Sequence, residues 1–302
     1  MKLGIVVPYF ENRQLLRKLL HSIVKQDSSD WKLLIIDDSG GKEPVDLTEL
    51  KSLSQDFELV SNHSTLGIGE SWNVGLKCMF DRFKPEILSV VHADDELEKD
   101  YVSKVISAHE AFPNAFAIYT GVKIIDEASN EKFSFPDYIK TLISPRSGSQ
   151  HTVLKGDLGL SRLLAGDFIF CPTLSFKTEQ VDLPLFDSKW RMVVDLDLLS
   201  RALISNKEIV GIPTKIYRYR RHDHNLTAQL NRTMARFHEE IDFYLDLSMK
   251  CRATGFSRSA NAASQMTIIK LHLVFQILTS VFRGQISRTR ALYRILRIAL
   301  RG

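Results

Sequence analysis

Short apolar runs alternate along the first part of the chain with segments whose apolar residues recur every three to four positions. The runs have the length of buried strands, and they lie at residues 3–7, 31–36, 57–61, 87–91 and 116–120. Helical spacing follows three of them, at residues 15–23, 70–83 and 98–112. Strands that alternate with helices in this way predict an α/β fold with a mostly parallel sheet and right-handed crossovers.

The pattern changes twice toward the C-terminus. Residues 127–150 are rich in serine, proline and glycine, and we expect a long loop that covers a site. Further short elements follow, with helices predicted at 157–164 and from about 193, and strands at 173–176, 209–212 and 215–219. After residue 227 the pattern is helical, at 233–251, 260–282 and 287–300. We therefore predict an α/β domain over residues 1–228 and a helical C-terminal extension over residues 229–302.

Paired carboxylates follow two of the predicted strands. Asp37 and Asp38 end the second strand, and Asp94 and Asp95 come directly after the fourth. Open α/β sheets bind ligands at the carboxyl ends of their strands, and oxygen ligands there suit a hard divalent cation that holds substrate phosphates. For an isolated Asp-Asp pair, capping of a helix N-terminus is the better explanation. The remaining segments decide between the two.

Three further segments carry candidate chemistry. Gly67 and Gly69 lie at a helix start, where backbone amides can meet phosphate, although a tight turn explains them equally well. Asp195 and Asp197 fall in the first turn of a predicted helix, where a structural cap would be ordinary. The segment 218–227 is dense in cations and imidazoles, which fits either a solvated basic loop or an anion and metal site.

Composition and charge narrow the classes of protein. The chain has 302 residues, 44% of them hydrophobic and 25% charged, which is typical of a globular protein. The net charge of +4 is modest, so we expect no nucleic-acid partner. Cys78, Cys171 and Cys251 lie far apart and fit neither a disulfide framework nor a zinc spacing, which predicts a reducing, cytoplasmic location. The first apolar run is too short for a signal peptide.

The C-terminal segment differs from the rest of the chain in its apolar and basic patterns. Residues 267–282 are apolar but interrupted by Lys270, His272 and Gln276, and we expect this segment not to span a bilayer. Residues 283–302 contain six arginines and no acid. Helical spacing puts four arginines on one face and four apolar residues on another, namely Arg290, Arg294, Arg297 and Arg301, and Leu292, Ile295, Leu296 and Ala299. This basic amphipathic helix predicts binding to anionic lipid at a membrane surface, and packing on the body or on a second subunit is the alternative.

Taken in order, six segments resemble the motifs of the inverting family 2 glycosyltransferases of the GT-A fold. They are Val6–Glu11, Leu34–Gly40, Leu66–Leu76, Val91–Leu97, Val194–Leu198 and Tyr219–Thr227. The resemblance extends over residues 3–228. It implies a GT-A fold, a Rossmann-like mixed and mostly parallel sheet flanked by helices, and transfer of a sugar from a nucleotide diphosphate sugar to an acceptor hydroxyl with inversion. A divalent cation, Mn²⁺ or Mg²⁺, is the implied cofactor.

The resemblance also assigns residues. Asp195 matches the catalytic base, and Asp94 is the first choice as metal ligand, with Asp95 beside it and His222 approaching late. The residues that match the nucleotide-sugar site are Pro8, Tyr9, Glu11, Asp37, Asp38, Gly67, Asn73, His92, Ala93, Asp94 and Arg220. The implied partners are the nucleotide sugar and a glycan or lipid-linked acceptor in bacterial cell-surface polysaccharide or glycolipid synthesis. We further expect a peripheral position on the inner face of the plasma membrane and homo-oligomers formed through the C-terminal helices.

Two departures from the family pattern keep other functions open. His92 stands where the family has the first Asp of its metal motif, which removes one negative charge, and Val194 replaces the Glu before the base. A catalytically inactive glycosyltransferase-like binding subunit is therefore one alternative. A nucleotidyltransferase is another, although such enzymes carry a glycine- and arginine-rich loop after the first strand, where this chain has Pro8–Asn12.

Overall fold

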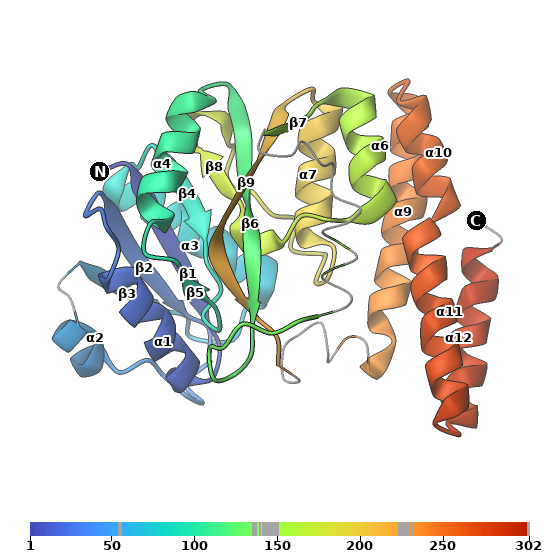
Figure 1. Ribbon diagram of the computed structural model, residues 1–302, viewed down its shortest axis with the longest axis horizontal. Coiled ribbons are helices and arrows are strands. Elements are labelled where there is room, and N and C mark those ends of the chain that lie inside the picture. The colour runs from blue at the N-terminus through green and yellow to red at the C-terminus, as the bar shows by residue number, and fades with distance from the viewer. Residues whose placement is uncertain are drawn as a thin grey trace.

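The structure is a computed structural model that describes residues 1–53, 56–134, 138, 140, 151–222, 230 and 232–300. Its strands are β1 Leu3–Tyr9, β2 Trp31–Asp37, β3 Phe57–Ser61, β4 Ile87–Val90, β5 Glu96–Leu97, β6 Ala115–Ile125, β7 Thr152–Leu154, β8 Ser175–Lys177 and β9 Glu208–Arg220. They form one mixed sheet in the order β3-β2-β1-β4-β8-β6-β9-β5, with β7 paired to β9 (Figure 1). The parallel ladders, β3-β2-β1-β4 and β6-β9, are the long ones.

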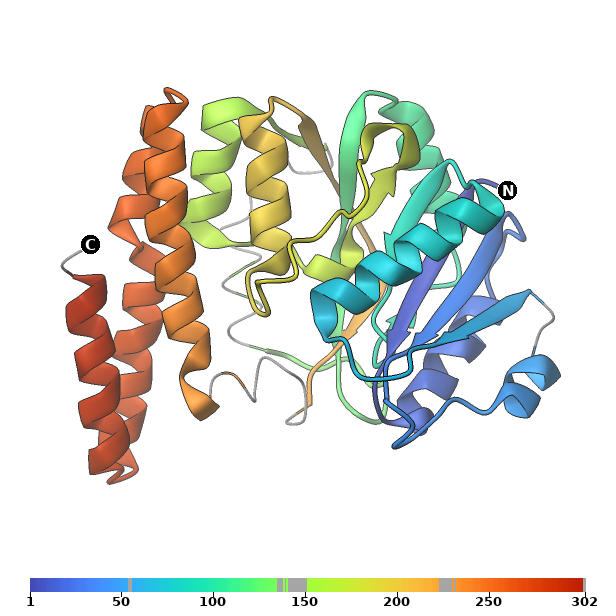
Figure 2. The same ribbon diagram turned by 180° about the vertical axis from the view of Figure 1, so that it is seen from behind.

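The helices cover both faces of this sheet and add a layer beside it. They are α1 Arg13–Val24, α2 Leu47–Leu53, α3 Ile68–Phe83, α4 Tyr101–Ala111, α6 Gly156–Gly166, α7 Val194–Ile204, α9 Ala235–Ala253, α10 Ser257–Gln265, α11 Thr267–Phe282 and α12 Ile286–Ala299, with short 3-10 turns η1 Cys171–Thr173 and η2 Thr178–Gln180. Helices α1 and α4 lie on one face, and α3 and α7 on the other (Figures 1 and 2). Helices α9 to α12 stack beyond α6 at the far end from the N-terminus.

Side chains point alternately to the two faces of the strands, and they contribute to two hydrophobic cores. In β1, Ile5 and Val7 join the core under α1 and α4, while Val6 joins the core under α3. Gly75 lets α3 lie directly on the sheet, because a Cβ there would come within 2.5 Å of Val6. The core under α3 continues into α9, α11 and α12, so these helices share buried apolar residues with the sheet domain.

The predicted α/β fold is confirmed, with differences in detail. Pro8 does not end β1 but pairs with Ile36. Since the pairing of β1 with β4 stops at Val6, the absent N–H of Pro8 leaves no β4 group without a partner. Helix α2 and strand β7 were not predicted, and the two strands predicted within residues 209–219 are one strand, β9, which runs through bulges opposite β6. Much of the predicted loop 127–150, and the end of the motif at 219–227, lie outside the described residues.

The C-terminal helices correct one expectation. The apolar side of α12 is not available to lipid, because Leu292, Ile295 and Ala299 are buried in the core shared with α9 and α11. Packing on the body, the alternative, is what the structure has. Within the described residues, the stretch Ser257–Phe282 is long and apolar enough to cross a membrane, by length and composition only. It has 26 residues, and an 18-residue window within it has a mean hydropathy of 1.4. The sequence predicted that the shorter segment 267–282 would not span a bilayer.

Candidate active site

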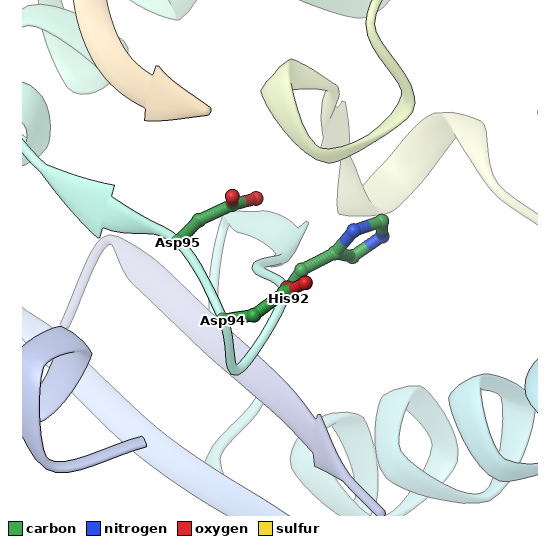
Figure 3. A group of neighbouring side chains, drawn as sticks. All are labelled: His92, Asp94 and Asp95. Carbon is green, nitrogen blue, oxygen red and sulfur yellow. The ribbon is translucent and has the colours of Figure 1, made fainter. Parts of the chain in front are cut away.

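The turn between β4 and β5 brings together three side chains that can ligate a cation. One ligand atom from each of His92, Asp94 and Asp95 lies within 4.8 Å of the others (Figure 3). The turn begins at the carboxyl end of β4, where the Val91 amide donates to the carbonyl of Val6. A buried parallel strand therefore fixes its position, at the sheet edge where the sequence predicted a site.

Asp94 is the carboxylate of this group that remains open to a ligand. Its side chain is 32% exposed, and its Oδ2 lies 2.8 Å from Nε2 of His222. Burial raises the pKa of Asp94, but the hydrogen bond from His222 and the nearby His92 ring outweigh it and lower that pKa overall. The same bond raises the pKa of His222. Asp94 is thus ionised at neutral pH, and the structure brings His222 to it, as the sequence predicted.

His92 presents an imidazole nitrogen to the same space. Its ring packs against Trp72 of α3 with centroids 5.4 Å apart, and its Nε2 is buried without a hydrogen-bond partner among the described residues. Burial lowers the pKa of His92, so the ring is neutral and a nitrogen lone pair is available. One imidazole with carboxylates fits a divalent cation, and it favours Mn²⁺ over the harder Mg²⁺.

Asp95 is buried and fixes the turn to β9. Its Oδ2 accepts a hydrogen bond from the Tyr217 hydroxyl at 2.9 Å, and its Oδ1 accepts one from the Arg220 amide at 2.7 Å. Burial, followed by the charge of Asp94, raises the pKa of Asp95 well above its usual range. Asp95 therefore shapes the turn through these bonds, and Asp94 is the better metal ligand of the two.

Arg220 differs from the expectation that it contacts a diphosphate. Its guanidinium is buried, and it donates to the carbonyls of Asp94 and Asp126 and to the carboxylate of Glu96. All its nitrogens thus have partners within the protein. A buried cation so enclosed holds the turn in place, because removing it would take this donor from the carbonyls of Asp94 and Asp126 and would leave Glu96 paired with the more distant Arg218.

The two carboxylates after β2 organise the neighbouring loops. Asp37 accepts from the amides of Ser39 and Val45, at 3.0 and 2.8 Å. Asp38 accepts from the side chain of Asn62 and the amides of Leu66 and Gly67. Both are buried at the strand end predicted for the nucleotide. Their bonds fix the loops that follow β2 and leave Asp38 part of its lone-pair capacity.

Four further residues predicted for the nucleotide site differ in their surroundings. Tyr9 is buried at the end of β1, while Glu11 is exposed in the loop that follows. Gly67 has φ +90° and caps α3, so a side chain there would be strained. Asn73 does not face a ligand, because its amide group exchanges two hydrogen bonds with the backbone of Phe186, at 2.8 and 2.9 Å. It ties α3 to a distant segment instead.

Asp195 lies in the first turn of α7 in a setting suited to a base. Its Oδ1 accepts from the Leu196 amide at 2.9 Å. Burial, followed by the charge of Asp167, raises the pKa of Asp195 to about 7, against the lowering effect of Lys140. A carboxylate with a pKa near 7 can take a proton at neutral pH far better than an ordinary one.

Aromatic contacts connect this base to the cation group. The Asp195 carboxylate bonds to the thiol of Cys171 in η1, and η1 packs against β4 and β6. Phe170, next to Cys171, meets Tyr219 of β9 edge to face, with ring centroids 5.3 Å apart. Tyr219 directly precedes Arg220, which bonds to the carbonyl of Asp94. The base and the cation group are thus linked through one strand end.

Sequence reasoning missed the groups that surround Asp195. Lys140 pairs with Asp167 at 3.4 Å, and both act on the base. Glu239 of α9 accepts the backbone amides of Arg191, Met192 and Val193 through one oxygen, at 2.9, 2.5 and 3.1 Å. Glu239, on a helix of the C-terminal extension, therefore holds the turn that leads into α7. No local motif marks these residues, since their partners are up to 48 positions away.

The sheet topology and the carboxylates at its carboxyl edge define a GT-A type fold. Residues 4–155, half of the chain, match the family model described as Glycosyl transferase family 2. The chain belongs to this family. An uncharacterized glycosyltransferase of Haemophilus influenzae is 30% identical over 152 residues, and a second from the same organism is 23% identical over 125 residues. These matches cover 50% and 41% of the chain and 48% and 38% of the relatives, so the chain matches about half of their length or less.

Solved structures share the fold at low identity. S. aureus TarS 1–349 in complex with UDP-GlcNAc has a TM-score of 0.59 at 16% identity, covering 98% of this chain and 92% of TarS 1–349. The mannosyltransferase PcManGT from Pyrobaculum calidifontis, in complex with GDP-Man and Mn²⁺, has a TM-score of 0.59 at 12% identity, covering 99% of this chain and 86% of PcManGT. At these identities the likeness shows the fold.

Proposed function

We propose that the protein transfers a sugar from a nucleotide diphosphate sugar to an acceptor hydroxyl with inversion, and that it uses a divalent cation. The observation that carries the proposal is the contrast between two carboxylates, Asp94 and Asp195, that are linked through η1 and the end of β9. Asp94 is ionised and open, while burial lifts the pKa of Asp195 to about 7. Asp94 is suited to bind a cation and Asp195 to accept a proton, and sugar transfer from a nucleotide diphosphate sugar needs both roles.

In this mechanism Asp94 and His92 would hold the cation, and His222 would stay hydrogen-bonded to Oδ2 of Asp94. The bound cation stabilises the charge that develops on the leaving nucleoside diphosphate. Asp195 accepts the proton of the acceptor hydroxyl as that oxygen attacks the anomeric carbon, and the bond to the diphosphate breaks on the opposite side. Asp37, Asp38 and Gly67 shape the pocket for the nucleoside.

The donor class has support from the structural neighbours. TarS 1–349 binds UDP-GlcNAc, and PcManGT binds GDP-Man with Mn²⁺. We therefore propose a uridine or guanosine diphosphate sugar as donor, with Mn²⁺ as the preferred cation. Bacterial cell-surface polysaccharide or glycolipid synthesis, in the cytoplasm, is the proposed setting, and a glycan or a lipid-linked sugar is the proposed acceptor.

The test is a donor screen followed by transfer. Thermal shift with uridine, thymidine and guanosine diphosphate sugars, with and without Mn²⁺, identifies the donor. The anomeric configuration of the product by NMR then tests inversion. Asp195→Asn is expected to keep donor binding and lose transfer, while Asp94→Asn is expected to lose the Mn²⁺-dependent part of donor binding. Donor binding without turnover on any acceptor or on water would instead favour the inactive binding subunit.

A further inference from the structure

The charge of the chain is divided sharply at the end of α9. Residues 247–302 contain ten Lys and Arg and no Asp or Glu, whereas the chain as a whole carries +4. The first 246 residues therefore carry −6 and the last 56 carry +10. The basic part coincides with the outermost helices, α10, α11 and α12 (Figures 1 and 2). An asymmetry of this size favours an anionic partner for that end of the molecule.

Helix α11 has an apolar face that nothing in the described chain covers. Its inner side packs through Ile269 and Leu273 into the core. Its outer side carries a stripe at helical spacing, hereafter the α11 stripe, which consists of Leu271, Val274, Phe275, Leu278, Val281 and Phe282. Phe275 is 63% exposed and Phe282 89% exposed. Exposed apolar rows of this kind mark a surface that contacts a partner or a membrane.

Arginines accompany this stripe. Because the apolar side of α12 is buried, its exposed side carries Arg290, Arg294 and Arg297. Arg283 is exposed directly after Phe282, at the turn between the two helices. A cavity of about 200 Å³ opens at the same turn, and Arg283 is among its lining residues. Cations thus lie at the end of the apolar row and along the exposed side of the helix that packs beside α11.

The α11 stripe is short for a membrane span. The left-handed Met266, with φ +46°, separates α10 from α11. The 16 residues of α11 measure about 24 Å, less than the ~30 Å of a hydrocarbon core. One side of the helix is also committed to the protein core. A helix in this situation can lie in the plane of a membrane surface without crossing it.

We propose that the outer surface of α11 and α12 docks on an anionic lipid bilayer, with the α11 stripe at the boundary of headgroups and acyl chains and the arginines at lipid phosphates. Apolar side chains flanked by cations match the two layers of such a surface. A second copy of the chain is a poor occupant, because a symmetric contact would bring two sets of arginines together without an acid. The surface would keep the proposed transferase next to an acceptor on a lipid carrier.

Vesicle flotation of the full chain tests the proposal without donor or acceptor, so its outcome is independent of the proposed activity. The vesicles contain either phosphatidylcholine alone or phosphatidylcholine with phosphatidylglycerol. We expect binding to the anionic vesicles only, and weaker binding at high salt. The variant Phe275→Gln/Phe282→Gln should reduce binding at least about tenfold. Arg290→Gln/Arg294→Gln/Arg297→Gln should remove the preference for anionic lipid.

Phe80→Gln is the matched control, since Phe80 is an exposed aromatic residue of α3 on another part of the molecule. It should bind as the wild type does, and circular dichroism should show all variants folded. Three results would overturn the proposal. They are equal flotation of the wild type and the Phe275/Phe282 variant, a dimer that this variant converts to a monomer in lipid-free buffer, and retention in the membrane after alkaline carbonate extraction, which indicates a span.

Discussion

Replacing Asp195 with asparagine is expected to abolish transfer and, at the same time, to stabilise the fold at alkaline pH. Burial and the charge of Asp167 raise the pKa of Asp195 from 3.8 to about 7. The native state therefore keeps this proton over a pH range in which the unfolded chain has lost it. The free energy of unfolding consequently falls as the pH rises from about 4 to about 7, and above that it stays low.

The magnitude follows from the pKa. A difference of about three pH units, at about 1.4 kcal/mol for each, means that ionised Asp195 costs the fold up to about 4 kcal/mol. Part of this cost is already present at pH 5, so the advantage of Asp195→Asn should grow by about 2 kcal/mol between pH 5 and pH 8. The amide oxygen can still accept the Leu196 amide. In a chain of this size the extra advantage corresponds to a rise of about 4 °C in Tm.

Thermal unfolding at a series of pH values, without donor, measures this advantage. Asp242→Asn is the control, because Asp242 is exposed on α9 and its replacement should give no such pH dependence. A second variant tests the cause. Asp167→Asn removes the neighbouring negative charge, so the pH midpoint of kcat, below which activity falls, should move down from about 7. An Asp195→Asn protein whose advantage is constant across pH, or which is less stable than the wild type at pH 8, would refute the reasoning.

Three further predictions concern the surroundings of the site. Glu239→Ala should lower the free energy of unfolding by about 2 kcal/mol and should lower kcat about tenfold. Glu239→Gln keeps an oxygen for the three amides and should cost less than about 1 kcal/mol. Thermal unfolding and steady-state kinetics measure the two effects. His92→Asp should shift the cation preference from Mn²⁺ toward Mg²⁺ in a metal titration of donor binding, and an unchanged preference would contradict a ligand at position 92. Arg220→Ala should cost about 3 kcal/mol in urea unfolding, because the carbonyls of Asp94 and Asp126 lose a buried donor and Glu96 keeps only its more distant pairing with Arg218. A loss confined to donor affinity would instead indicate that Arg220 contacts the nucleotide sugar.

The sequence allowed the sheet and the position of the site to be predicted, for a physical reason. Buried strands such as β4 are mostly apolar, and the predicted strand 87–91 matches β4 to within one residue. The predicted strand 57–61 matches β3 at both ends, although β3 is only partly buried. Carboxylates that follow parallel strands lie at one sheet edge, so the position of the site after β2 and β4 could be predicted. His92, Asp94 and Asp95 lie close together because they belong to one turn. The resemblance added Asp195, which the pattern alone could not separate from a helix cap.

What the sequence could not show are contacts between distant residues. Arg220 and Asn73 lie within family motifs, yet their polar groups are bonded to the protein's own backbone and carboxylates. Partners of this kind, such as Phe186 for Asn73, are 113 positions away and carry no periodic signal. The face of α12 is a similar case. Its apolar residues were visible in the sequence, but only packing decides whether they meet lipid or protein.

The site separates two carboxylates by environment rather than by residue type. Asp94 gains a hydrogen bond from His222 and keeps a side chain 32% exposed, so it stays charged. Asp195 is removed from water and has the negative Asp167 nearby, so its pKa moves the other way. Opposite shifts allow one carboxylate to hold a cation while the other moves a proton at the same pH. Glu239 of α9 holds the turn that leads into α7, and α11 and α12 pack on α9, so the helix on which the proposed membrane surface packs also supports the segment of Asp195.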